Sequence, residues 1–131
     1  MSTSDGNEHQ FVVGEEYTRN EIREALGGGP TGYLPHKDGR VVCGTLTPGL
    51  NPRGPDVVLV GPGPETVRWA EVLCEQRYPV PMFVKSGYAR WGYRGEYEVN
   101  RSTAARRDIA KQERASGRTD IVRVMFLRKV R

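Results

Sequence analysis

The sequence has few of the residues on which metal sites and disulfide-linked folds depend. Its 131 residues include two cysteines and two histidines. Cys43 and Cys74 lie far apart and lack a CxxC spacing, so the sequence indicates neither a zinc site nor a redox pair. Both are expected to be small buried hydrophobes with reduced thiols. His9 and His36 are too few to hold zinc, so no metal is expected.

Long hydrophobic runs are absent too. No apolar stretch approaches the roughly 20 residues of a membrane-spanning helix, and the polar, acidic first residues do not have the pattern of a signal peptide. We therefore expect a cytoplasmic protein that does not enter a membrane. Its length and its 37% content of hydrophobic residues fit one globular core, so we expect a disordered tail over residues 1–10 and a single domain over residues 11–131.

The sequence also lacks recognisable catalytic motifs. No HExxH, GxSxG, Walker loop or paired-carboxylate pattern occurs. The triple glycine at residues 27–29 follows a predicted helix and has no GxxxxGK[ST] pattern, so it predicts a helix end and a loop. We therefore expect a binding module that needs no cofactor and is not an enzyme by itself.

Positive charge is present and is concentrated toward the C-terminus. Residues 85–131 hold 13 Lys or Arg and five Asp or Glu, a balance of +8, whereas residues 1–84 hold seven and eleven, a balance of −4. Clustered arginines attract phosphates through charge and paired hydrogen bonds, which favours a nucleic-acid partner. A basic surface that is merely solvated remains the alternative.

Periodicity and turn signals predict an α+β fold. Thr18 and Glu21 form a capping box at the start of a short helix, and Pro64 suits the first turn of a second helix that ends near Gln76. A third, polar helix over residues 103–115 would be capped by Ser102. Strands are predicted at residues 11–13, 41–47, 57–60, 82–85, 91–99 and 121–127. Together these elements predict a twisted, mostly antiparallel sheet that forms a partial β-barrel with two or three short helices.

The predicted strand at residues 91–99 has the clearest pattern. Trp91, Tyr93 and Tyr97 share one face, and the other face is mostly charged. Aromatic rings stack on bases, but alternating aromatics also fill the core of small barrels. Both interpretations stay open for Tyr93 and Tyr97. Trp91 begins the strand beside a loop, so we expect it to be open to solvent and to stack on a base.

Aromatic and basic residues around this strand and around residues 33–39 form the candidate nucleic-acid site, to which the basic helix adds two arginines. Its members are Tyr33, His36, Asp38, Lys85, Tyr88, Arg90, Trp91, Tyr93, Arg94, Arg106 and Arg107.

Several short segments together resemble a known family. They are residues 17–22, residues 33–44, Asn51 with Pro52, residues 80–85 and residues 91–97. In this order they resemble the PUA/SRA-like modules that are fused to nuclease or helicase domains in bacterial modification-dependent restriction systems.

The resemblance extends over residues 11–130 and implies a barrel whose concave face recognises a base. In SRA-like members that base is a modified cytosine rotated out of the duplex. The strand of Trp91 would then line the pocket, Tyr33 would stack from the opposite loop, and Asp38 would bind a base edge. Because this chain has no nuclease domain, a separately encoded nuclease or helicase is an expected partner.

Three hypotheses follow. The first is a module that recognises a modified base in DNA, and the second is an RNA-binding PUA-like domain. The third is a small nucleotide-binding enzyme in which Asp38, His36 and Lys85 act as acid, base and electrostatic group. An open basic groove would favour either of the first two, whereas a deep closed pocket would favour the third. The resemblance favours DNA over RNA, and the sequence leaves the oligomeric state undetermined.

Overall fold

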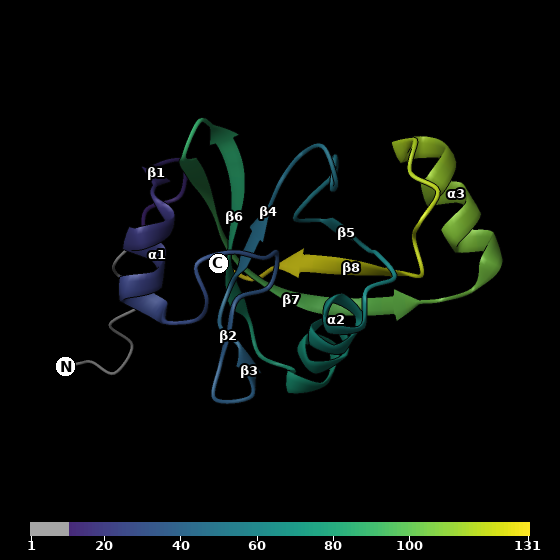
Figure 1. The fold of residues 1–131 in the computed structure, drawn as a ribbon, viewed down its shortest axis with the longest axis horizontal. Helices are drawn as coiled ribbons and strands as arrows, with labels where there is room; N and C mark the ends of the chain where they lie inside the picture. Colours follow the sequence, from purple (N-terminus) through teal and green to yellow (C-terminus); the bar gives the residue numbers. More distant parts are fainter. Residues whose placement is uncertain (1–10) are drawn as a thin grey trace.

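A curled β-sheet with three helices organises the chain (Figure 1). The computed structural model describes residues 11–131, so the expected tail at residues 1–10, with His9, lies outside the described part. In chain order the elements are β1 (Glu16–Tyr17), α1 (Arg19–Leu26), β2 (His36–Lys37), β3 (Arg40–Val41), β4 (Gly44–Leu46), β5 (Val57–Val60), α2 (Pro64–Gln76), β6 (Val80–Gly87), β7 (Arg90–Thr103), α3 (Arg106–Ser116) and β8 (Arg123–Lys129).

The main sheet is mixed but mostly antiparallel, as predicted. Its strand order is β4-β6-β7-β8-β5, β1 pairs with β7, and β4 with β6 is the parallel pair. Strands β2 and β3 form a separate hairpin. With three helices around this curled sheet, the structure confirms the α+β partial barrel.

Bulges bend the long strand β7. The pairing of β6 with β7 shifts register between Met82 and Phe83, and that of β7 with β8 shifts between Val99 and Arg101. An extra residue in one strand increases the local twist and bends it, which accounts for the curl of the sheet. Gly95 lies at the first bulge with φ +117°, and a Cβ atom there would be 2.6 Å from the carbonyl oxygen of Arg131. Only glycine fits this position.

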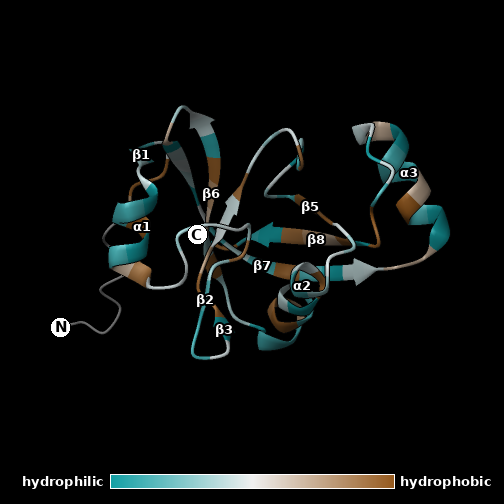
Figure 2. Cartoon of the chain, viewed as in Figure 1, coloured by the Kyte–Doolittle hydropathy of each residue, from teal (hydrophilic) through white to brown (hydrophobic). Residues whose placement is uncertain are grey.

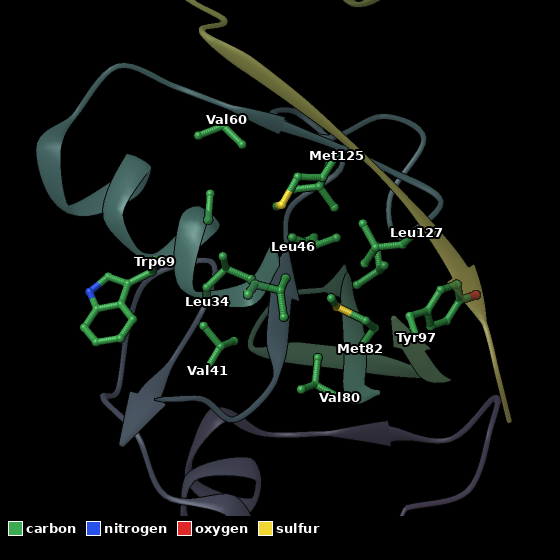
Figure 3. Close-up of a cluster of buried hydrophobic side chains, with 14 residues drawn as sticks. Leu34, Val41, Leu46, Val60, Trp69, Val80, Met82, Tyr97, Met125 and Leu127 are labelled. Carbon is green, nitrogen blue, oxygen red and sulfur yellow. The ribbon is translucent and has the colours of Figure 1, made fainter. Parts of the chain in front are cut away.

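The main core lies between α2 and the sheet (Figure 3). Pro64 begins α2, and the helix buries Trp69, Ala70 and Leu73. The hydrophobic residues are concentrated in β5, β8 and the helix α2, whereas α1 is mostly hydrophilic (Figure 2). Helix α1 begins with the predicted capping box between Thr18 and Glu21.

Several predicted elements differ from the structure. Residues 11–13 form no strand, although Phe11 is buried. The predicted strand at residues 41–47 is divided into β3, which pairs with β2, and β4, which pairs with β6. Strand β8 begins and ends two residues later than predicted.

The cap of the third helix was also wrong. Ser102 and Thr103 still belong to β7, where they pair with β8, so α3 begins at Arg106 after Ala105. No side chain caps this helix; the Thr103 hydroxyl instead accepts from the amide of Ala105 and donates to the carboxylate of Asp108.

Candidate functional site

A hollow of about 530 Å³ opens between the β6–β7 hairpin, the start of α1 and the segment that precedes β4. We call it the Trp91 hollow. It is lined by Arg19, Pro30, Thr31, Gly32, Tyr33, Thr45, Thr47, Leu50, Lys85, Tyr88, Ala89 and Trp91.

Two cations lie close to the ring of Trp91. The guanidinium carbon of Arg19 is 5.5 Å and the Nζ atom of Lys85 is 5.7 Å from the ring centroid. Trp91 itself is 8% exposed and packs in a cluster with Phe83 and Tyr93. The expectation that Trp91 is open to solvent was therefore wrong: its strand face points into this cluster, and the ring only forms part of the wall.

Arg19 is held firmly at the wall of the hollow. Its guanidinium donates to the carbonyl oxygens of Gly29 at 3.2 Å and of Gly32 at 3.4 Å. Burial lowers the pKa of Arg19 from its ordinary value, but a guanidinium remains charged at neutral pH. The site therefore contains a positioned positive charge, because both hydrogen bonds orient it.

Tyr33 and Thr45 form the adjoining part of the wall. The Tyr33 hydroxyl donates to the carbonyl of Thr66 in α2 at 2.5 Å, and burial raises the pKa of this phenol. The Thr45 hydroxyl donates to the carbonyl of Gly32 at 2.7 Å. With its hydroxyl engaged by α2, Tyr33 can offer a ligand its ring but not a free hydrogen-bond donor. The wall is fixed by these bonds before any ligand enters.

The tip of the β6–β7 hairpin projects beside the hollow. Tyr88 is 95% exposed there, and Lys85 and Arg90 are also exposed. Tyr88 lies between Lys85 and Arg90 in the sequence, so one hairpin exposes an aromatic ring and two cations. These side chains are available to a partner.

The structure brings four of the eleven predicted site residues to the Trp91 hollow: Tyr33, Lys85, Tyr88 and Trp91. The other seven lie elsewhere. Arg90 and Arg94 are exposed on β7, while Tyr93 is buried against Phe11 and Phe83.

The remaining predicted residues lie on other elements. His36 in β2 stacks on Trp69, and Asp38 is in the turn between β2 and β3. Arg106 and Arg107 are exposed on α3, at the opposite end of the molecule from α1 (Figure 1).

Sequence reasoning missed Arg19 and Thr45 as site residues. Arg19 follows the helix cap and Thr45 lies in a strand, where each had an ordinary structural explanation. Neither position carried a local signal, because the hollow joins segments that are distant along the chain.

Among the described residues 11–131, no cluster of His, Cys, Asp and Glu is suited to hold a metal ion. Within the same residues, no helix is both long and apolar enough to cross a membrane. Cys43 is buried and Cys74 is partly buried, and both are free thiols. Burial raises the pKa of Cys43 to about 12.

Comparisons with known proteins identify the fold. No protein-family model matches the chain. No curated protein matches it either. Among solved structures, the chain is similar to the SRA domain of SUVH5 in its complex with hemimethylated CG DNA, with a TM-score of 0.57 and 15% sequence identity over 90% of this chain and 87% of that one. The chain thus has an SRA-like fold.

Proposed function

We propose that this protein is a DNA-binding module that accommodates a modified base in the Trp91 hollow. The observation that carries the proposal is the composition of that hollow on an SRA-like fold: the ring of Tyr33, the cations Arg19 and Lys85, and hydroxyl-bearing walls. The base of a nucleotide offers flat faces for stacking, and the phosphate of the nucleotide is attracted by positive charge nearby.

The positive charge around the hollow supports a nucleic-acid ligand. Lys85 and Arg90 stand on the exposed hairpin, and Arg19 lies within the wall. Exposed Tyr88 between these cations can contact a base or sugar while they contact phosphates. The C-terminal excess of Lys and Arg would increase the attraction to a polyanion.

The proposal favours DNA with a modified cytosine over RNA. SUVH5, which shares the fold, is seen in complex with hemimethylated CG DNA. A nuclease or helicase that acts on the recognised DNA is the partner we propose, on the basis of the resemblance of the sequence to modules of modification-dependent restriction systems.

The enzyme hypothesis finds no support in the geometry. Lys85 lines the Trp91 hollow, His36 lines a different hollow, and Asp38 lines neither of them. An acid, a base and a cation must meet around one reacting atom.

A binding panel tests the proposal. Plain, hemimethylated and hydroxymethylated duplexes, single strands and structured RNA are titrated against the protein at one salt concentration. We expect preference for DNA with a modified cytosine. Lys85→Gln should weaken binding by roughly 10-fold, as expected when one contact to a charged group is lost. Arg23→Gln, which removes an exposed cation outside the hollow, is the matched control. The absence of nucleic-acid binding by the unaltered protein would refute the proposal.

A further inference from the structure

A second hollow adjoins the Trp91 hollow. This second hollow, which we call the His36 hollow, has a volume of about 310 Å³. It is lined by Gly29, Thr31, Gly32, Tyr33, Leu34, Pro35, His36, Glu65, Thr66 and Trp69. The two hollows share Thr31, Gly32 and Tyr33 as a common wall. The two hollows therefore lie next to each other with Tyr33 between them, and a single base in the Trp91 hollow would leave the His36 hollow empty.

The floor of the His36 hollow contains a stacked aromatic pair. The imidazole of His36 lies 3.6 Å from the ring of Trp69, centroid to centroid, at an angle of 10°. His36 is exposed, whereas Trp69 is 8% exposed and lies at the margin of the core cluster (Figure 3). The imidazole therefore covers one face of the buried indole and presents its own outer face to solvent as a flat aromatic surface.

Polar contacts hold this pair in place. The indole Nε1 of Trp69 donates to the carboxylate of Glu65 at 3.2 Å, which fixes the plane of the ring. The guanidinium carbon of Arg68 is 5.0 Å from the same ring. A preformed aromatic plane with a neighbouring cation is the combination that binds bases of single strands, where stacking is largely independent of sequence.

We infer that the His36 hollow binds a second base, that of the nucleotide next to the one in the Trp91 hollow. The ligand is then two successive unstacked nucleotides, in single-stranded DNA or in a locally opened duplex. This inference rests on the proposed function, because the first base must enter the Trp91 hollow. The shared wall at Tyr33 is the observation that connects the two sites.

A double perturbation tests the inference. The probe is a short single-stranded oligonucleotide with one 5-methylcytosine, with its neighbours intact or with the 5′ or 3′ neighbour replaced by an abasic residue. His36→Ala should weaken binding of the intact probe by about 5- to 150-fold, the equivalent of ~1–3 kcal/mol for a base–aromatic stack. It should have almost no effect on binding of one of the two abasic probes, namely the one that lacks the base held in the His36 hollow.

Two variants serve as controls. His36→Phe keeps an aromatic ring and should restore most of the affinity for the intact probe. Asp38→Asn alters an exposed residue of the neighbouring turn that lines neither hollow, and should leave binding unchanged. Because His36 is exposed, the melting temperature of His36→Ala should stay close to that of the unaltered protein.

The outcomes separate this inference from the proposed function. If His36→Ala weakens binding of the intact probe and of both abasic probes equally, or weakens binding of none of them, the second base site is refuted while recognition of the first base stands. If the unaltered protein binds no probe and no duplex, the proposed function itself fails.

Tryptophan fluorescence gives an independent measurement. The protein has two tryptophans, so Trp91→Phe leaves Trp69 as the sole reporter. We expect the emission of Trp69 to change when this variant binds the intact probe. It should change little when the variant binds the abasic probe that lacks the base held in the His36 hollow. Equal responses to both probes at saturation would overturn the second site.

Discussion

Replacement of Trp91 by alanine should lower the free energy of unfolding, independently of any effect on binding. The indole is 8% exposed and packs beside Phe83 and Tyr93. A tryptophan buries about 200 Å² of surface, which at about 25 cal/mol per Å² corresponds to an upper limit of about 5 kcal/mol. Since alanine retains a small part of this and leaves a cavity, we expect a loss of about 3–5 kcal/mol.

Such a loss is large for a domain whose total stability is typically about 5–15 kcal/mol. At about 3–5 °C per kcal/mol for a chain of this size, the melting temperature should fall by roughly 10–20 °C. Thermal unfolding followed by circular dichroism measures this fall. Lys85→Gln, next to Trp91 in the same hollow, should weaken DNA binding and shift the melt by only about 1–2 °C.

Titration with DNA well below the melting temperature completes the test. If Trp91→Ala melts within about 2 °C of the unaltered protein and has lost its affinity, Trp91 is a stacking residue and its assignment to the core is refuted. Trp91→Phe, which fills most of the cavity, should recover much of the lost stability.

Three further predictions follow from other parts of the molecule. Joint replacement of Arg106 and Arg107 by alanine should reduce the log–log salt slope of duplex binding by about 1.8 if both meet phosphates; an unchanged slope would make α3 a solvated surface. Gly95→Ala should cost about 2 kcal/mol or more in urea unfolding, because alanine disfavours φ +117° and its Cβ would clash with the backbone; a neutral result would contradict the tight fit. Because burial raises the pKa of Cys43 to about 12, the unfolded thiol ionises first, so stability should be complete below about pH 8.5 and fall progressively toward pH 12. Stability measured from pH 7 to 11 should fall less in Cys43→Ala than in the unaltered protein, and equal slopes would contradict this.

Local signals in the sequence were sufficient to predict several elements. The capping box at Thr18, the proline that begins α2 and the apolar run of β5 act through nearest neighbours along the chain, and all three are confirmed. The break between β3 and β4 could not be predicted, because it depends on which distant strand each part pairs with: β2 for β3 and β6 for β4. Ser102 failed as a cap for the same reason: pairing with β8 extends β7 past it.

The candidate site was harder to predict than the fold. Alternation along β7 correctly placed Trp91 and Tyr93 on one face, but it wrongly placed Tyr97 with them, because the bulge at Gly95 turns Tyr97 to the other face, where it packs with Val80 and Met82. Alternation also does not say whether a face points inward. That depends on Phe11 and Ile22, which come from distant segments. Arg19 contacts the ring of Trp91 but lies far from it along the chain, so no pattern within either segment reveals the contact.

The position of β8 in the sheet has a consequence for protein synthesis. Strand β5 pairs with β8, and residues 57–60 are all buried apolar residues. During translation these residues leave the ribosome long before residues 123–129, at about 5–20 residues per second. For several seconds the nascent chain therefore carries an unpaired strand of Val-Val-Leu-Val, a short apolar segment of high β-propensity that can associate with other chains. The polar loops on either side of it, rich in proline and glycine, then limit how far such association can spread.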